Sequence, residues 1–228
     1  MGNVTFFFDN NSLCDRVYEY LRGQIMSGQL PPNTKLPETE LASTMNVSRA
    51  PIREALNMLA NDGFVVRVPR HGAVVAPVTK KEIDENWDLR LLLEPYAAKT
   101  ACACIPEKEL HAVRQQLMDV LDVEDFSMYM DADYKTHSVI YQHVPNSQLQ
   151  NILHSTMLNS MRYRYFVENS CPTGRDIMHA VCREHLTIID ALLRRDEESA
   201  YRSMHSHIQQ GYQRIQTQFA QIHSNPAP

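Results

Sequence analysis

Four residues of the chain have side chains that bind divalent metal ions: Asp133, His137, His185 and His207. Asp133 and His137 are four residues apart, so on a helix they lie one turn apart on the same face. Imidazole suits zinc, nickel, iron or copper, and a carboxylate extends the choice to manganese. If three helices of one bundle bring these side chains together, they form a metal site. By itself, the spacing is more typical of histidines that are solvated or buried in a core.

A second group of residues has side chains suited to DNA recognition. Arg49 and Arg53 are four residues apart at the start of a predicted helix, and Ser48 before them suits the N-cap position. Arg67 and Arg70 follow in a predicted hairpin. A helix with arginines at its N-terminal end and a basic hairpin after it suits reading of the major groove with contacts to the backbone. The alternative for each arginine is a solvated surface charge.

Three helices and a two-stranded wing are predicted to position these arginines. The helices are expected over residues 12–27, from Leu36 onward and from Ser48 to Gly63, and the strands over residues 64–68 and 73–78. Asn46 suits the turn between the second and third helices, because Asn tolerates left-handed backbone angles. The order helix, helix, turn, helix and wing is that of a winged helix-turn-helix.

From Thr79 onward the sequence predicts helices alone. Apolar residues recur at helical spacing, as in Leu110, Val113 and Leu117, and only two glycines follow Gly72. We expect six or seven helices packed as a bundle. The chain is therefore predicted to be mainly α-helical, with a winged helix-turn-helix domain over residues 1–78 and an all-α domain over residues 79–228.

The net charge of −5 is unevenly distributed. Residues 1–78 hold seven Lys or Arg and seven Asp or Glu, and the rest of the chain holds 15 against 20. Nonspecific attraction to phosphates is weak for such a neutral domain, which favours binding to a specific site.

The sequence predicts a cytoplasmic protein with free thiols. No run of about 18 apolar residues is present, and the N-terminus lacks the pattern of a secretory signal. The five cysteines form no CxxC pair, and their odd number argues against a disulfide framework. We expect free thiols in a reducing compartment and no association with membranes.

The run LPETELASTMNVSRAPIREALNMLANDGFVVRVPRHGAVV resembles the winged helix-turn-helix of the GntR family of bacterial transcription regulators. The matching marks include Leu36-Pro37, Glu40-Leu41-Ala42, Val47-Ser48-Arg49 and the wing glycine Gly72. The resemblance implies contacts between operator DNA and both the third helix and the wing. The residues predicted to make them are Ser48, Arg49, Pro51, Arg53, Arg67, Arg70, His71 and Gly72.

The second half resembles the FCD effector domain of the FadR-like GntR subfamily. The marks are Asp133-x-x-x-His137, Pro145-Asn146-x-x-Leu149, Arg183-Glu184-His185 and Met204-x-x-His207-Ile208. The resemblance implies that Asp133, His137, His185 and His207 bind one divalent metal ion. Zinc is the first candidate, with nickel, manganese and iron as others.

Two arginines are predicted to meet an effector. The resemblance covers Arg90, which in relatives faces the cavity and meets an effector carboxylate, and a guanidinium donates two parallel hydrogen bonds to such a group. The alternative for Arg90 is a weak intrahelical pair with Glu94. Arg162 is a further candidate to line the cavity.

Together these features predict a homodimeric transcription regulator, most simply a repressor, and not an enzyme. Its binding to double-stranded operator DNA would respond to a small organic acid held at the metal site. Two alternatives remain open at this point. In the first alternative, the chain is a metal-dependent enzyme that acts on a small acid, with Glu184 as the one candidate general base. In the second, the metal ion has a purely structural role.

Overall fold

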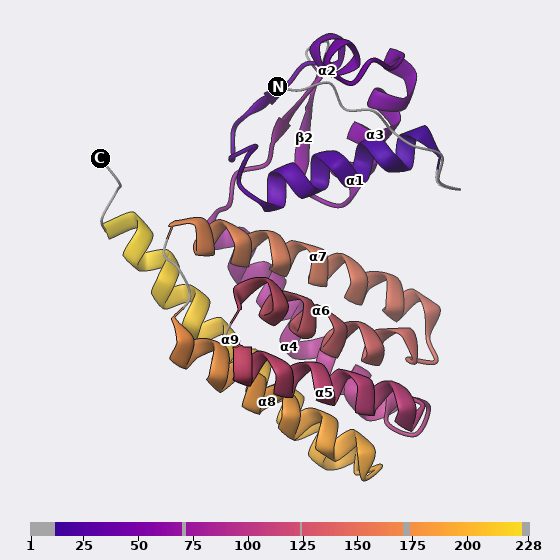
Figure 1. The fold of residues 1–228 in the computed structure, drawn as a ribbon, viewed down its shortest axis with the longest axis vertical. Helices are drawn as coiled ribbons and strands as arrows, with labels where there is room; N and C mark the ends of the chain where they lie inside the picture. Colours follow the sequence, from indigo (N-terminus) through magenta and orange to yellow (C-terminus); the bar gives the residue numbers. More distant parts are fainter. Residues whose placement is uncertain (1–11, 70–71, 124, 171–173, 225–228) are drawn as a thin grey trace. The chain divides into compact units, whose positions relative to one another are not determined.

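The computed structural model describes residues 12–69, 72–123, 125–170 and 174–224. The chain forms two compact units. The N-terminal unit comprises Met1–Thr79 and Met161–Asn169, and the C-terminal unit comprises Lys80–Ser160 and Ser170–Pro228. The described residues form nine helices and three short strands, which confirms the mainly α-helical class (Figure 1). The predicted boundary between residues 78 and 79 stays a prediction.

Three helices form the core of the N-terminal unit: α1 (Leu13–Met26), α2 (Glu38–Met45) and α3 (Arg49–Asn61). Ser12 begins α1 with a capping box, in which its hydroxyl accepts from the amide of Asp15 and the Asp15 side chain accepts from the Ser12 amide. The apolar faces of α1 and α3 supply the fully buried Val17, Leu21, Ile52, Leu56 and Leu59. Burial of these side chains holds α3 in place with its arginines on the opposite face.

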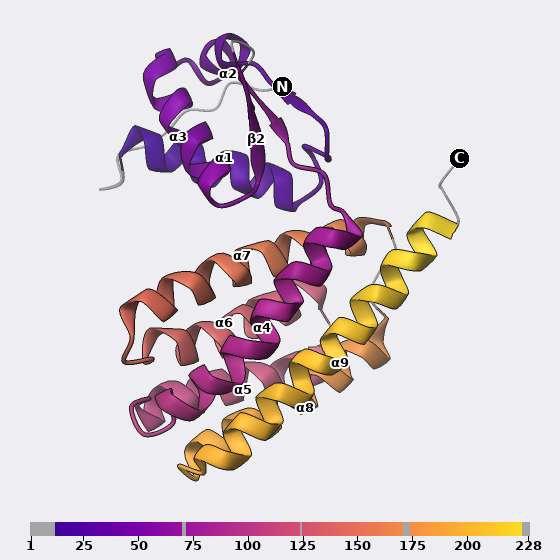
Figure 2. The ribbon, with the colours of Figure 1, turned by 180° about the vertical axis from the view of Figure 1, so that it is seen from behind.

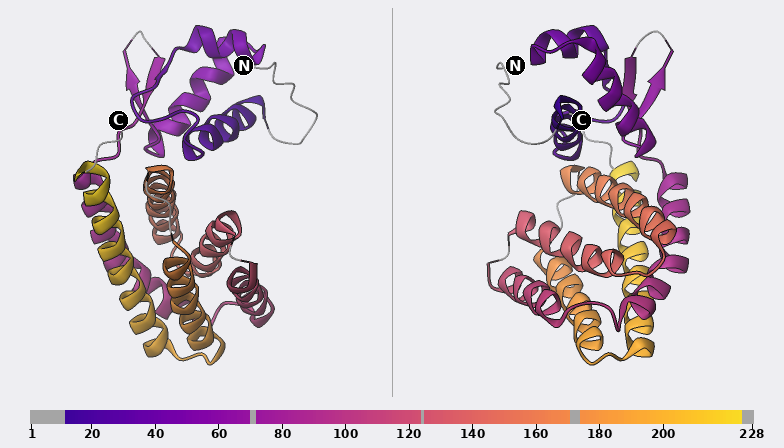
Figure 3. Two further views of the ribbon diagram at one scale, coloured as in Figure 1. Left: turned by 60° about the vertical axis from the view of Figure 1, so that its left-hand side comes forward. Right: turned by 90° about the vertical axis from the view of Figure 1, so that its right-hand side faces the viewer.

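The start of α2 differs from its prediction. Leu36 was expected to begin the helix, but it belongs to strand β1 (Lys35–Leu36), and Pro37 is the N-cap. β1 pairs antiparallel with β3 (Gly72–Val75), which also pairs with β2 (Val65–Val68), so the sheet order is β1-β3-β2. The predicted hairpin is the β2–β3 pair, seen as two arrows in Figure 3. A strand of two residues is too short to show an alternating pattern, so β1 was missed.

The turn between α2 and α3 has the predicted backbone but not the predicted cap. Asn46 adopts the left-handed conformation, with φ 52° and ψ 47°. Ser48 occupies the N-cap position of α3, but its side chain makes no capping hydrogen bond. The expectation that its hydroxyl caps the helix is therefore wrong in this structure, and the exposed hydroxyl is available to another partner.

Gly72 lies where the wing approaches the start of α2. Its φ is +89°, a backbone conformation that residues other than glycine rarely adopt. A Cβ at this position would lie 2.4 Å from the carbonyl oxygen of Leu36 and 3.2 Å from the Cα of Pro37. This glycine therefore allows β3 to pair closely with β1. The structure gives Gly72 a structural role, and its predicted contact with DNA stays a prediction.

Six helices follow Thr79 in the described residues, a number within the predicted range. They are α4 (Lys80–Ala101), α5 (Glu107–Val123), α6 (Phe126–Gln142), α7 (Ser147–Ser170), α8 (Arg175–Leu193) and α9 (Glu197–Ser224). Of these, only the second half of α7, from Met161 to Asn169, belongs to the N-terminal unit. α9 runs alongside both α4 and α8 (Figure 2). Trp87 of α4 is buried and stacks on Tyr212 of α9, with 6.3 Å between ring centroids. Among the described residues, no helix is long and apolar enough to cross a membrane.

Buried apolar residues pack α8 against both α6 and α9. Ile140 of α6, Ile188 and Ile189 of α8, and Met204 of α9 are fully buried. Because protein cores are closely packed, these buried residues leave little freedom for neighbouring side chains on the same helix faces. The polar residues on these faces therefore have well-defined positions.

We predict that Gly72→Ala lowers the free energy of unfolding by at least about 2 kcal/mol, because the backbone is strained and the new Cβ meets a carbonyl oxygen. Urea unfolding of the full chain, followed by circular dichroism, measures this change. Gly23→Ala in α1 is the control, since its Cβ would meet nothing within 4 Å and Ala favours a helix. Equal midpoints for the two variants would contradict the role given to Gly72.

Candidate metal centre and DNA-reading surface

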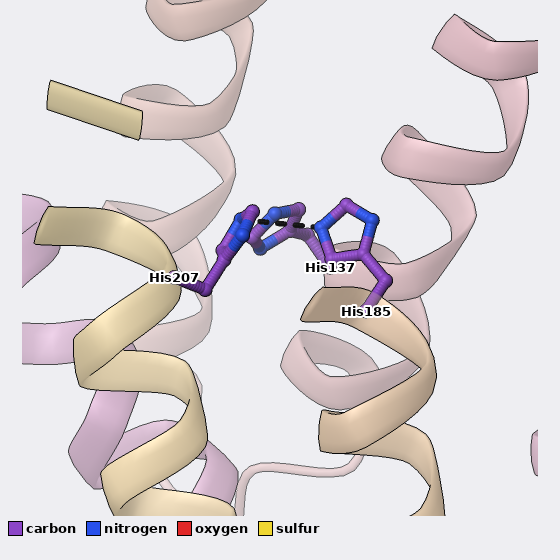
Figure 4. Close-up of side chains that lie close together, drawn as sticks. All are labelled: His137, His185 and His207. Carbon is purple, nitrogen blue, oxygen red and sulfur yellow. Dashed lines mark hydrogen bonds between the residues drawn. The ribbon is translucent and has the colours of Figure 1, made fainter. Parts of the chain in front are cut away.

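Three histidines from three helices meet in the core of the C-terminal unit. His137 of α6, His185 of α8 and His207 of α9 form the histidine cluster (Figure 4). Their ligand nitrogens all lie within 4.8 Å of one another, and the Nε2 atoms of His185 and His207 are 3.1 Å apart. The three residues are 2%, 0% and 5% exposed, respectively. Side chains more than 20 residues apart in the sequence thus converge in a site shielded from water.

Asp133 adds a carboxylate to the cluster. It lies one turn before His137 on α6, and its Oδ1 is 3.6 Å from Nε2 of His185. Asp133 is itself buried. The structure therefore brings together all four residues that the sequence analysis selected as metal ligands.

A carboxylate from α4 lies beside Nδ1 of His137, the ring nitrogen on the side away from the other two histidines. Glu94 is fully buried, and its Oε2 is 2.8 Å from Nδ1 of His137. Its other oxygen, Oε1, accepts a hydrogen bond from Nε of Arg90, one turn earlier on α4. Burial alone would raise the pKa of Glu94, but Arg90 and His137 outweigh it and hold that pKa well below its usual range. Glu94 is therefore ionised.

His207 has a similar arrangement on its outer side. Its Nδ1 is 2.8 Å from Oε2 of Glu184, and Arg214 donates one hydrogen bond of 2.8 Å to each oxygen of that carboxylate. Burial would raise the pKa of Glu184, but the hydrogen bonds from His207 and Arg214 lower it below its usual value. Burial lowers the pKa of His207 and Glu184 opposes this, but the net pKa lies below the usual value, which favours the neutral imidazole that metals bind.

The two carboxylates orient the histidines for ligation. A carboxylate beside Nδ1 favours the tautomer with its proton on that nitrogen, which leaves the lone pair of Nε2 for a cation. Nε2 of His137 is buried and has no hydrogen-bond partner among the described residues. The distances of 3.1 and 3.6 Å from Nε2 of His185 to its neighbours lie around the ~3.3 Å that separates ligands of a tetrahedral zinc ion. The donor set and its geometry therefore fit a divalent metal.

The two arginines predicted to meet an effector lie in different surroundings. Arg90 is 6% exposed and pairs with Glu94, so the intrahelical alternative is the arrangement present, but in a buried setting rather than at a surface. Arg162 of α7 is also buried, and its Nη1 donates to the carbonyl oxygens of Ala76 and Pro77, at 3.3 and 3.2 Å. The structure thus brings Arg90 next to the histidine cluster and gives Arg162 main-chain partners elsewhere.

The surface that the sequence predicts to read DNA lies between α3 and the wing. Arg49, Arg53 and Arg67 line a groove of about 790 Å³, together with Pro37, Glu38 and Thr39, among others. The side chains of Arg49 and Arg53 are 58% and 56% exposed, and that of Arg67 is 33% exposed. Pro51 is half-buried in the first turn of α3. Arg70 and His71 lie outside the described residues.

One carboxylate joins the three arginines. Glu38, the first residue of α2, accepts hydrogen bonds from Arg67 at 2.9 Å and from Arg53 at 3.2 Å, and Nη2 of Arg49 lies 3.6 Å away. The hydrogen bond from Arg67 lowers the pKa of Glu38 and burial opposes it, but Arg53 adds to the lowering. The net pKa is below the usual value, so Glu38 is charged at neutral pH.

Four contacts were not predicted from the sequence. They are those of Glu38 with the three arginines, of Glu94 with His137, of Glu184 with His207 and of Arg214 with Glu184. The pairing of Arg90 with Glu94 had a signal, namely their spacing of four residues. Glu184 had only its position next to His185, and neighbours on a helix point in different directions. Glu38 and Arg214 had no signal, because each finds its partners in another element.

Comparison with known proteins assigns both units. Residues 13–75 match the family of bacterial regulatory proteins described as the gntR family, and residues 85–210 match the FCD domain. A gluconate operon transcriptional repressor of Bacillus licheniformis is 30% identical over 200 residues, which are 83% of this chain and 79% of the relative. The transcriptional repressor RspR of Escherichia coli is 27% identical over 203 residues, which are 86% and 85% of the two chains.

A solved structure shares the fold of both units. The structure of E. coli McbR/YncC matches with a TM-score of 0.77 and 20% identity, and the match covers 92% of this chain and 99% of the other. The matched gntR family and both relatives are transcriptional regulators, which confirms that this chain is a regulator and not an enzyme. The chain belongs to the GntR family of bacterial transcription regulators and carries the FCD domain of its FadR-like subfamily.

Proposed function

We propose that this regulator represses transcription from an operator and releases it when a small organic acid binds at the metal centre. The protein acts in the cytoplasm as a homodimer, and each N-terminal unit contacts half of a two-fold operator. Arg49, Arg53 and Arg67 make contacts at the groove between α3 and the wing. The observation that carries the proposal is the buried set of three imidazoles and a carboxylate in the C-terminal unit.

The metal ion is proposed from the donor set. Asp133, His137, His185 and His207 would hold it, with Glu94 and Glu184 as the carboxylates that orient two of the imidazoles. Three nitrogens and one oxygen suit zinc first, with nickel, manganese and iron as alternatives. The ion would supply positive charge, and because four side chains already fill a tetrahedral shell, an anion would bind to it as an additional ligand that raises the coordination number.

The charges around the cluster favour an anionic effector. Asp133, Glu94 and Glu184 carry three negative charges, and Arg90 and Arg214 carry two positive charges. The side chains therefore sum to one negative charge, and a divalent ion turns this into one positive charge. A carboxylate would neutralise that charge in a site from which water is largely excluded, where charges interact strongly. One relative is named for the gluconate operon, so sugar acids are the first class to test.

A role for Arg90 in binding the acid requires a change of partner. Its guanidinium already pairs with Glu94, so the acid would have to share or replace that carboxylate. Breaking a buried ion pair costs about 3–5 kcal/mol when one charge is left without a partner. The effector carboxylate would supply the replacement charge. Arg162 stays a weaker prediction, because its Nη1 already has two carbonyl partners.

A structural metal is the second candidate, and the burial of the ligands favours it. None of the four side chains is more than 8% exposed. An ion there would stabilise the helical bundle without responding to any acid. The experiments below separate the two functions.

We predict that zinc or manganese raises the melting temperature of chelator-treated protein, because an ion that binds only the folded state stabilises it. At a free concentration 100 times the dissociation constant the gain is about 2.7 kcal/mol. His185→Ala should abolish the shift. His205→Ala is the control, because His205 is exposed on α9 two residues before His207. A full shift in His185→Ala would contradict the proposed site.

We predict that gluconate or a related sugar acid weakens DNA binding of the metal-loaded protein about fivefold or more. The DNA is a duplex that the wild-type protein selects from random sequences, and fluorescence anisotropy measures the affinity. His137→Ala should bind this duplex but lose the response to the acid. A protein that metal stabilises, but whose DNA affinity no acid in a broad panel changes, would favour the structural metal.

The homodimer needs an apolar surface, and α4 offers one. Leu89, Leu92 and Tyr96 are 45%, 71% and 53% exposed, and their spacing places them along one face of α4. In a two-fold dimer the same patch meets its own copy. We propose that this stripe lies in the dimer interface.

We predict that Leu92→Glu converts the dimer to a monomer, because it places two like charges in an apolar interface. Sedimentation of the full chain measures the mass. Ile152→Glu is the matched control, since Ile152 is 47% exposed on α7 of the same unit. If both variants remain dimeric, α4 is not the interface.

A further inference from the structure

We propose that Glu38 is a positioning residue that sets the sequence specificity of DNA binding. It would act through Arg49, Arg53 and Arg67, which it holds together, and not by touching a base. The inference rests on the proposed contact of these arginines with DNA. The negative charge of Glu38 repels DNA phosphates, but its contacts hold the arginines in the arrangement that would bind a specific sequence.

The position of Glu38 makes it the common partner of separate elements. It begins α2, whereas Arg49 and Arg53 lie in the first two turns of α3 and Arg67 lies in β2. Oε1 of Glu38 accepts from Nη2 of Arg67, and Oε2 accepts from both Nε and Nη2 of Arg53. One side chain, only 10% exposed, therefore connects the recognition helix to the wing.

The three guanidinium groups need a counter-charge in order to converge. Three positive guanidinium groups that approach one carboxylate within 2.9 to 3.6 Å repel one another, and the negative charge of Glu38 offsets that repulsion. Arginine side chains also have much rotamer freedom to lose when they bind. Holding them in one arrangement before DNA arrives removes part of that loss from the binding step.

The contacts leave the arginines able to reach DNA. Arg49 and Arg53 remain more than half exposed, although both lie beside Glu38. Glu38 takes hydrogen bonds from Nε and Nη2 of Arg53, and no bond from Nη1 occurs within the described residues. A base edge or a phosphate can therefore bind the outer part of each guanidinium while the inner part stays fixed.

Removing the charge of Glu38 should change specific and nonspecific binding in opposite directions. The N-terminal unit would gain one net positive charge, which favours nonspecific attraction to phosphates. The arginines would lose their shared anchor, which weakens contacts that depend on their geometry. Specificity, the ratio of the two affinities, would fall. A residue needed only for folding would lower both affinities through the fraction of folded protein and would leave this ratio unchanged.

The test compares Glu38→Gln with Glu40→Gln in the full chain. Both substitutions remove one negative charge from α2, but Glu40 is exposed and has no ion pair among the described residues. Two probes are used: the duplex that the wild-type protein selects from random sequences, and an unselected random duplex of equal length. Affinities are measured at two salt concentrations, and melting temperatures are measured in parallel.

Glu38→Gln should lower the affinity ratio of selected to random duplex about tenfold or more, without a loss of affinity for the random duplex. Glu40→Gln should leave the ratio near that of the wild-type protein. An unchanged ratio in Glu38→Gln, or tighter binding to the selected duplex, would overturn the inference. If Glu38→Gln does not fold, Glu38→Asp decides, because it keeps the charge but withdraws it by one methylene. A severalfold lower ratio then supports the inference, and a wild-type ratio overturns it.

The combined variant Arg49→Ala/Arg53→Ala separates this inference from the proposed function. If it binds the selected duplex as the wild-type protein does, the proposed DNA contacts are wrong, and the inference falls with them. If it loses that binding while Glu38→Gln keeps the wild-type ratio, the contacts stand and the role of Glu38 alone is wrong.

Discussion

The carboxylates of Glu94, which is fully buried, and Glu184, which is 14% exposed, are the groups on which the histidine cluster depends. Each lies beside Nδ1 of one imidazole, and each is neutralised by an arginine that approaches from the other side. Glu94 is fully buried, where a charge without a partner is unfavourable by several kcal/mol, whereas the partly exposed Glu184 depends less on its arginine. The arginines thus stabilise the carboxylates, and the carboxylates orient the imidazoles of His137 and His207 with Nε2 turned toward the proposed metal site.

The N-terminal unit uses the same chemistry with the roles exchanged. In the cluster, arginines hold carboxylates so that histidines can act, whereas at the groove one carboxylate holds arginines that act themselves. The first arrangement is mostly buried, so salt screens its charges only weakly. The second is half open, and its outer charges are screened by salt. This difference matches the proposed partners, a small acid taken out of water at the cluster and operator DNA at the groove.

The sequence predicts the helices of both units well, because apolar residues at helical spacing mark them directly. It also predicts the meeting of Asp133, His137, His185 and His207, through a resemblance over several motifs rather than through spacing alone. It does not predict β1, whose two residues form a strand only because β3 lies beside them. Nor does it predict the roles of Glu38 and Arg214. Their partners lie in other elements, and the direction of a long side chain depends on packing that one sequence does not reveal.

The pairing of β1 with β3 at Gly72 also determines how the N-terminal unit behaves mechanically. β1 leads directly into α2, and β3 forms one side of the wing, so two of the elements around the groove are joined through main-chain hydrogen bonds. The hydrophobic core fixes α3 to α1. Within the described residues, α3 also contacts β2 and β3. A unit joined in this way should move as one body, so the proposed regulation would act on its orientation rather than on its shape.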